Sequence, residues 1–205
     1  RRAGAEVWVK HENHTPIGAF KVRGGLVYMD ALKQQGGTSR VLAATRGNHG
    51  QSIAFAAARA GLGATIVVPI GNSPGKNAAM RAFGAELIKH GRDFQEALEH
   101  CMTLAGGDGV TLVPSFDIGL AKGVASYALE LFDAAPDLHT VYVPIGLGSG
   151  ICGLISARDA LGLKTEIVGV VSENAACYAL SFDAGEVIST NSADTLADGM
   201  ACRVP

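Results

Sequence analysis

The chain has 205 residues and a formal net charge of −2 at pH 7, with 48% hydrophobic and 18% charged residues. A slightly negative net charge gives no excess of basic residues of the kind that binds nucleic acid. No apolar stretch reaches the ~18 residues that are needed to span a membrane. The low charged content indicates a large buried fraction rather than disorder. We therefore expect a folded cytoplasmic protein without nucleic-acid or membrane partners.

Short apolar runs alternate with helix-type runs along the whole chain. We expect strands at Val7–Lys10, Val41–Ala44, Ala64–Pro69, Glu86–Ile88, Thr111–Pro114, Val141–Pro144 and Ile167–Val171. We expect helices at Gly24–Gln35, Gln51–Ala60, Lys76–Phe83, Phe94–Ala105, Leu120–Phe132, Gly150–Leu161 and Ala175–Ser181. Val- and Ile-rich strands separated by helices are typical of βαβ units, so the predicted fold class is α/β with an open parallel sheet.

The first chemical motif surrounds Lys21. This lysine follows Phe20 in the run Thr15–Gly25, which has a Pro/Gly turn before it and small or apolar residues around it. An ammonium among such neighbours is poorly hydrated, which lowers its pKa and suits a nucleophile or base. The alternative is a lysine that buries its stem and extends its charged end to water.

The second motif is a strand-turn-helix joint with the sequence Thr45-Arg46-Gly47-Asn48-His49-Gly50-Gln51. Free N–H groups and the helix dipole favour an anion at such a joint. The glycines let the backbone approach a ligand, and Asn48 offers a donor and an acceptor. The alternative is an ordinary tight turn, and His49 either touches substrate or caps the helix.

The third motif is the glycine-rich loop Gly146-Leu147-Gly148-Ser149-Gly150, between a predicted strand and a predicted helix. Clustered N–H groups at a helix start form a cradle for phosphate. The loop lacks the Gly-Lys-Ser/Thr ending of a nucleoside-triphosphate loop and the spacing of a dinucleotide fold.

In this order, the three motifs resemble those of the pyridoxal-phosphate enzymes of the tryptophan-synthase β-like fold, also called fold type II. The branch that looks most similar contains the threonine/serine dehydratases and their serine racemase relatives. The resemblance runs from Val7 to Gly199 and includes the segment Thr195–Gly199. It implies pyridoxal 5'-phosphate as cofactor, an amino acid as substrate, and a homo-oligomer, either a dimer or a tetramer.

The resemblance also assigns roles to individual residues. Lys21 is the catalytic residue and the Schiff-base lysine. The other implied cofactor-binding residues are Phe20, Asn48, Gly146, Leu147, Gly148, Ser149 and Gly150. The implied substrate-binding residues, which receive the carboxylate, are Thr45, Arg46, Gly47 and His49.

The family pattern implies two lobes with the cofactor between them. Residues 40–115 would form the smaller lobe, and residues 1–39 and 116–205 the larger, discontinuous one. The catalytic unit of the family is longer at both ends, so the resemblance implies a sequence truncated at both ends.

The implied reaction is β-elimination from L-threonine or L-serine to a 2-oxo acid and ammonia, which makes the protein an ammonia-lyase. Racemisation is disfavoured, because Arg46 replaces a hydroxyl residue of the racemases and cannot collect a proton. Arg46 also leaves hydroxyaspartate open as a substrate. A non-catalytic cofactor-binding homologue and a nucleotide-binding module are the remaining alternatives. We predict no metal, because valine and alanine replace the acids of the family's metal site within Val170–Ala176.

Overall fold

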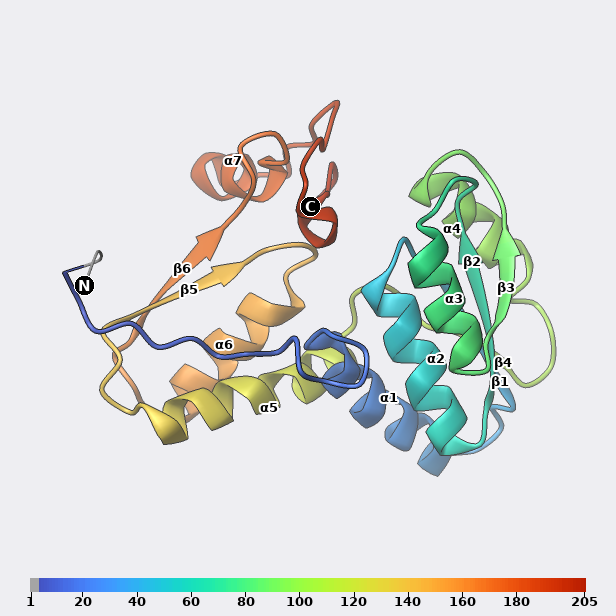
Figure 1. Cartoon of the computed structure of the whole chain (residues 1–205), viewed down its shortest axis with the longest axis horizontal. Coiled ribbons are helices and arrows are strands. Elements are labelled where there is room, and N and C mark those ends of the chain that lie inside the picture. The colour runs from blue at the N-terminus through green and yellow to red at the C-terminus, as the bar shows by residue number, and fades with distance from the viewer. Residues whose placement is uncertain (1–3) are drawn as a thin grey trace.

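The computed structural model describes residues 4–205 and has two sheets joined by packed helices (Figure 1). The elements in chain order are α1 Lys21–Gln35, β1 Arg40–Ala44, α2 Asn48–Ala60, β2 Gly63–Val68, α3 Pro74–Ala82, β3 Glu86–Lys89, α4 Phe94–Thr103, β4 Val110–Leu112, α5 Ile118–Ala134, β5 Thr140–Pro144, α6 Ser149–Ala160, β6 Glu166–Val170, α7 Cys177–Ala184 and the 3₁₀ turn Asp198–Met200. Within residues 4–205, every helix is too short or too polar to cross a membrane.

The first sheet has four parallel strands in the order β3-β2-β1-β4. The central strands β1 and β2 are almost completely buried. Their side chains alternate between two cores: Val41 and Ile66 face the core that contains Met80 of α3, and Val67 faces the core that contains Cys101 of α4. Burial on both faces explains why these strands are continuous apolar runs.

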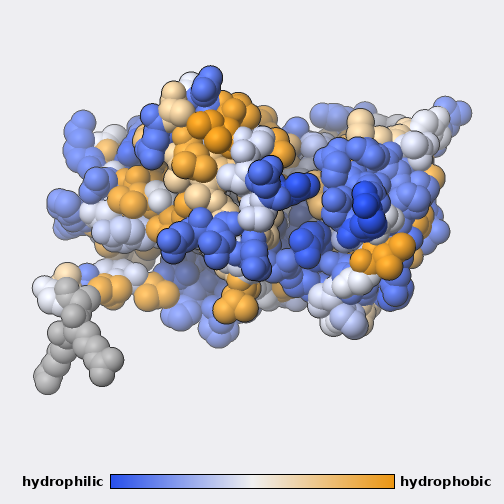
Figure 2. Space-filling model, turned by 90° about the horizontal axis from the view of Figure 1, so that it is seen from above, coloured by the Kyte–Doolittle hydropathy of each residue, from blue (hydrophilic) through white to orange (hydrophobic). Residues whose placement is uncertain are grey.

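The second sheet consists of the parallel strands β5 and β6. Val143 of β5 packs with Phe132 of α5 and Leu154 of α6. The next residue towards the N-terminus, Tyr142, points away from this core and is 72% exposed. Viewed from above, apolar residues gather on the half that carries β5, β6 and α7 (Figure 2). This sheet is therefore covered on one face and open on the other.

Helix α1 connects the two parts, because it contacts α2 on one side and α5 on the other. Glycines make the second contact very close. A Cβ atom on Gly24 would lie 2.6 Å from the Leu120 carbonyl oxygen, and one on Gly123 would collide with the Arg23 carbonyl oxygen. The backbones of α1 and α5 thus touch directly at this crossing.

We expect Gly123→Ala to destabilise the protein by about 2–3 kcal/mol, because the added methyl group meets backbone atoms that cannot rotate away. The matched control is Gly75→Ala in α3, where an added Cβ has no neighbour within 4 Å. The control should leave stability unchanged or raise it by up to about 1 kcal/mol. Urea unfolding of both variants measures the difference, and equal unfolding midpoints would contradict the packing argument.

The structure corrects one predicted strand and shifts every helix start except that of α4 by one to three residues, with the largest shifts at α1 and α2. Val7–Lys10 is not a strand: no strand in the described part of the chain pairs with it, and Val7 and Trp8 are 65% and 55% exposed. Its apolar alternation favours an extended chain, but a strand also needs a hydrogen-bonding partner. Helices α1 and α2 begin three residues before the predicted Gly24 and Gln51, so that Lys21 and Asn48 are their first residues.

Candidate active site

Lys21 is the first residue of α1, and the preceding turn fixes its position. Thr15 Oγ1 accepts a hydrogen bond from the Ala19 N–H and donates one to the Ala19 carbonyl, both at 2.9 Å. Gly18, with φ +66°, closes this turn. The Lys21 Nζ lies 5.5 Å from the centroid of the Phe20 ring. The turn therefore places the amine beside an aromatic side chain.

Burial lowers the pKa of Lys21 below its ordinary value, and no charged side chain within residues 4–205 opposes this effect. The residue as a whole is partly buried. The positive end of the α1 dipole further disfavours an ammonium at this position. A larger fraction of neutral amine makes Lys21 a better nucleophile and base.

Thr45 organises the loop between β1 and α2. Its Oγ1 accepts hydrogen bonds from the N–H groups of Gly47 and Gly50, at 3.0 and 3.2 Å. These two donors are thus already occupied. In the part of the chain that the structure describes, the N–H groups of Asn48 and His49 have no partner at the first turn of α2. The N–H groups of Asn48 and His49 can therefore donate to an anion, whereas those of Gly47 and Gly50 cannot.

His49 is buried, with 8% of its surface exposed, and its Nε2 has no hydrogen-bond partner. The Val113 carbonyl accepts a hydrogen bond from the ring. Burial, together with the nearby charge of Lys21, lowers the pKa of His49 to about 3. The ring is therefore neutral at physiological pH, and its Nε2 is an unpaired polar atom in the buried part of the site.

Helices α1 and α2 are joined at their first turns. Ser52 Oγ donates a 2.6 Å hydrogen bond to the Lys21 carbonyl oxygen. A Cβ atom on Gly25 would collide with Ser52 Oγ, so only glycine leaves room for this contact. The sequence analysis did not identify Ser52, because a single serine on a helix gives no signal that it reaches another helix.

The glycine-rich loop lies between β5 and α6, as predicted. Gly148 caps α6 in the left-handed conformation with φ +91°, and Ser149, the first helical residue, is buried. A Cβ atom on Gly146 would collide with the Gly199 carbonyl oxygen, so the loop lies directly on the segment after α7. Leu147, the next residue of the loop, is partly buried. The first N–H groups of α6 are thereby presented at a sharp backbone turn.

Phe20 connects the lysine turn to the glycine-rich loop. Its ring lies 5.9 Å from the ring of Tyr127, whose hydroxyl donates a 2.9 Å hydrogen bond to the Gly150 carbonyl. A Cβ atom on Gly150 would lie 3.6 Å from the Phe20 ring. Tyr127 was not identified from the sequence. The structure thus brings all three motifs together around the start of α1.

Arg46 differs from the other predicted site residues, because its side chain is 56% exposed. Its guanidinium lies 4.0 Å from the Asp198 carboxylate, which also forms an ion pair with Lys76. The Lys76 side chain lies over Gly47, within 3.2 Å of where a Cβ atom would stand. Asp198 therefore links the segment after α7 to the loop before α2, and the sequence analysis assigned no role to Lys76.

These residues fit the cofactor that the resemblance implies. A left-handed glycine at the start of a helix suits a phosphate group. A lysine with a lowered pKa suits attack on an aldehyde. The Nε2 of His49 is a buried polar atom without a partner, and such atoms are usually hydrogen-bonded to a protein group, a water molecule or a ligand. Within residues 4–205, no group of three or more His, Cys, Asp or Glu side chains is placed to hold a metal ion.

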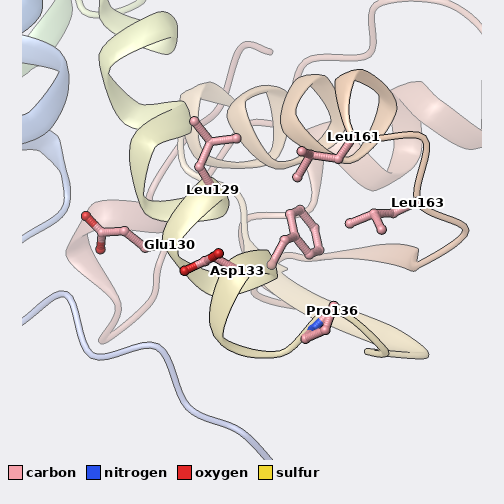
Figure 3. A pocket seen from close by; sticks show the side chains of 7 residues that line it. Leu129, Glu130, Asp133, Pro136, Leu161 and Leu163 are labelled. Atoms are coloured by element: carbon pink, nitrogen blue, oxygen red, sulfur yellow. The ribbon is translucent and has the colours of Figure 1, made fainter.

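A surface pocket of about 740 Å³ lies elsewhere, between the end of α5 and the segment that leads into β6 (Figure 3). Its lining is mainly apolar, with Leu129, Leu161 and Leu163. The Glu130 carboxylate at its edge is paired with Lys10 and Arg23. None of the predicted site residues lines this pocket, and it is not the candidate active site.

Comparison with known proteins connects these features to a family. The biosynthetic L-threonine dehydratase of Pasteurella multocida is 33% identical over 203 residues, covering 98% of this chain and 40% of that protein. The processed form of threonine deaminase isoform 2 from Solanum lycopersicum superposes with a TM-score of 0.88 at 32% identity, covering 95% of this chain and 57% of that one. Maize serine racemase gives a TM-score of 0.88 at 28% identity, covering 93% and 58%.

The predicted α/β fold with parallel sheets, of the tryptophan-synthase β-like type, is confirmed by these superpositions. The chain spans about two fifths of the length of the first curated relative and under two thirds of each superposed chain. The family model described as pyridoxal-phosphate dependent enzyme matches residues 1–205. The chain therefore belongs to the pyridoxal-phosphate dependent enzyme family.

Proposed function

We propose that the full-length protein is an ammonia-lyase that converts a β-hydroxy amino acid, L-threonine or L-serine, to a 2-oxo acid and ammonia. Lys21 binds the cofactor covalently. The Asn48 side chain contacts the cofactor ring, and the loop Gly146–Gly150 holds the phosphate. The relatives named threonine dehydratase and threonine deaminase support the choice of reaction.

Pyridoxal phosphate, when bound, supplies an electron sink that allows the Cα–H bond of the amino acid to break. The protein supplies the remaining parts. The free N–H groups of Asn48 and His49 bind the substrate carboxylate at the positive end of the α2 dipole. The neutral Nζ of Lys21 takes the proton from Cα, since its lowered pKa leaves a lone pair available.

One observation carries the proposal: the burial-lowered pKa of Lys21 at the point where the three motifs meet. A lysine that merely reaches solvent keeps its ordinary pKa. Hydrogen bonds from Ser52 to the Lys21 carbonyl and from Tyr127 to Gly150 hold the lysine and the loop in fixed positions. Such preorganisation is what a group that must transfer a proton requires.

A panel of amino acids incubated with the full-length protein tests this function. We expect L-threonine to yield 2-oxobutanoate and L-serine to yield pyruvate, each with one equivalent of ammonia. Keto-acid and ammonia assays run in parallel confirm the stoichiometry. Cofactor binding without any product would instead identify a non-catalytic homologue.

Racemisation is the second candidate, favoured by the superposition on maize serine racemase. It requires a group that exchanges protons on the face of the substrate opposite Lys21. Arg46 occupies the corresponding position, stays protonated, and is engaged with Asp198. We therefore expect L-serine to give pyruvate without D-serine at a comparable rate, which chiral chromatography in the same panel measures.

An acidic substrate such as hydroxyaspartate is a further candidate. Arg46 and Lys76 already bind one carboxylate, that of Asp198, beside the loop before α2. The substrate panel includes this amino acid for that reason. Preference for it over L-threonine would assign Arg46 and Lys76 to substrate recognition.

We also propose the division into lobes at 40–115 and at 1–39 with 116–205. The four-stranded sheet falls inside the first range and the β5–β6 sheet inside the second, which supports these boundaries. A cytoplasmic location and assembly into a dimer or tetramer complete the proposal. Size-exclusion chromatography of the full-length protein measures the assembly.

A further inference from the structure

The 3₁₀ turn after α7 contacts both of the loops to which the cofactor phosphate and the substrate carboxylate are assigned. The Gly199 carbonyl oxygen packs so closely on the glycine-rich loop that a Cβ atom on Gly146 would collide with it. One residue earlier, the Asp198 carboxylate forms an ion pair with Lys76 and lies 4.0 Å from the Arg46 guanidinium. The turn therefore brings a carboxylate from the phosphate loop to the loop before α2.

Two cations lie beside the N–H groups that the proposed function assigns to the substrate carboxylate. The Lys76 side chain covers Gly47, with Nζ 2.9 Å from where a Cβ atom of that glycine would stand. Arg46 directly precedes Gly47. The N–H groups that lack a partner within residues 4–205 belong to the next two residues, Asn48 and His49. An anion on these N–H groups would thus have an ammonium and a guanidinium as neighbours.

An acidic amino acid would bring a second carboxylate to these cations. In 3-hydroxyaspartate, the two carboxylates are attached to adjacent carbon atoms, Cα and Cβ, so both reach the same small region. In this structure a carboxylate of the protein itself already contacts both cations. The side chains of Lys76, Asp198 and Arg46 are 30%, 40% and 56% exposed, so the trio is partly shielded from water and its charges interact more strongly than in bulk solvent.

We propose that Asp198 is a specificity-determining residue: its carboxylate occupies the place between Arg46 and Lys76 that the side-chain carboxylate of an acidic amino acid would take. The site is thereby kept for neutral β-hydroxy amino acids, whose side chains need no cation. The inference rests on the proposed function in placing the α-carboxylate of the substrate on the N–H groups of Asn48 and His49.

A merely structural role for Asp198 predicts a different outcome. If Asp198 only joined the turn to the loop before α2, its loss would weaken the binding of neutral and acidic amino acids alike. A carboxylate that excludes acidic ligands has the opposite signature, because its loss frees two cations and improves the binding of acidic ligands alone. The ratio of the two affinities therefore separates the two roles.

The experiment measures amino-acid binding to the cofactor-loaded full-length protein by the change in its visible absorbance. The ligands are L-aspartate and L-2-aminobutyrate, which lack a β-hydroxyl group and so cannot undergo the elimination. Asp198→Asn removes the charge and keeps the shape, whereas Asp198→Glu keeps the charge. The matched control is Asp194→Asn, which removes an exposed carboxylate from the same segment.

We expect Asp198→Asn to raise the affinity for L-aspartate relative to L-2-aminobutyrate by about fivefold, as for one partly exposed ion pair. High salt should reduce this gain, since it screens exposed charges. The gain should be lost when Lys76→Met is added to Asp198→Asn, because one of the two cations is then absent. Asp198→Glu and Asp194→Asn should keep the wild-type ratio.

An unchanged ratio in Asp198→Asn would overturn the inference, as would equal weakening of both ligands or a wild-type protein that binds L-aspartate more tightly than L-2-aminobutyrate. Failure of both ligands to bind the wild-type protein would overturn the placement of the substrate carboxylate, and the inference with it. If Asp198→Asn does not fold, as judged by near-ultraviolet circular dichroism, Asp198→Ser takes its place.

The proposed function fails by a separate measurement. Absence of ammonia release from every amino acid in the substrate panel would overturn it, while the ratio of binding affinities would still test Asp198. The two failures are thus distinguishable.

Discussion

Lys21→Ala is expected to abolish the covalent attachment of the cofactor and to lower turnover by at least about 10³-fold. In the proposed function, the substitution removes both the group that binds the cofactor and the base that takes the Cα proton. Within residues 4–205, Lys21 alone combines a lowered pKa from burial with a position at the meeting point of the three motifs, so no other lysine there is placed to replace it. Loss of the visible absorbance of the purified protein is the first measurement.

Lys122→Ala is the matched control, since Lys122 is exposed on α5. It should keep both absorbance and turnover. Borohydride reduction of the wild-type protein, followed by peptide mapping, should place the adduct on Lys21. An adduct on Lys10, Lys33 or Lys122 would refute the assignment.

Gly148→Asp should lower the affinity for pyridoxal phosphate by about 3–4 kcal/mol, or several hundred-fold. The new carboxylate would lie at the start of α6, where the backbone N–H groups are proposed to bind a doubly charged phosphate, and it would repel that phosphate. The φ of +91° adds a conformational cost for any residue with a side chain. Titration of the cofactor-free protein by absorbance gives the affinity.

Gly162→Asp separates the two contributions. Gly162 has a similar left-handed conformation, with φ +67° and no neighbour near an added Cβ, but lies after the other end of α6. This control should lose stability while keeping cofactor affinity. Equal affinity of wild type and Gly148→Asp would mean that the phosphate binds elsewhere.

The two largest errors in the predicted helix starts fall at helices that no side chain caps. Helix α4 begins at Phe94, as expected, because Asp93 accepts a hydrogen bond from the Glu96 N–H. Helices α1 and α2 have Phe20 and Gly47 at their caps, with no side-chain hydrogen bond, and both starts were predicted three residues late. The two helix starts that were predicted too late are the ones that carry Lys21 and Asn48.

The candidate site likewise has residues that the local sequence predicts and residues that it does not predict. Lys21, Asn48 and Gly148 lie in local runs whose glycines and neighbours can be recognised without knowing the fold. Ser52 and Tyr127 act on residues 31 and 23 positions away, Lys21 and Gly150. Such pairs depend on how the helices cross, which glycine contacts on α1 and α5 determine and which no short sequence window contains.

The contact between Gly25 and Ser52 has a consequence for how this protein can change over time. The hydroxyl of Ser52 fills the space that a methyl group at position 25 would need, and it is bonded to the backbone of Lys21. A smaller residue at position 52 would remove the hydroxyl but not the Ser52 carbonyl oxygen, which lies 3.0 Å from where a Cβ atom at position 25 would stand. Position 25 is therefore restricted to glycine by the backbone of α2 as well as by the Ser52 side chain, and a substitution at position 52 alone cannot release it.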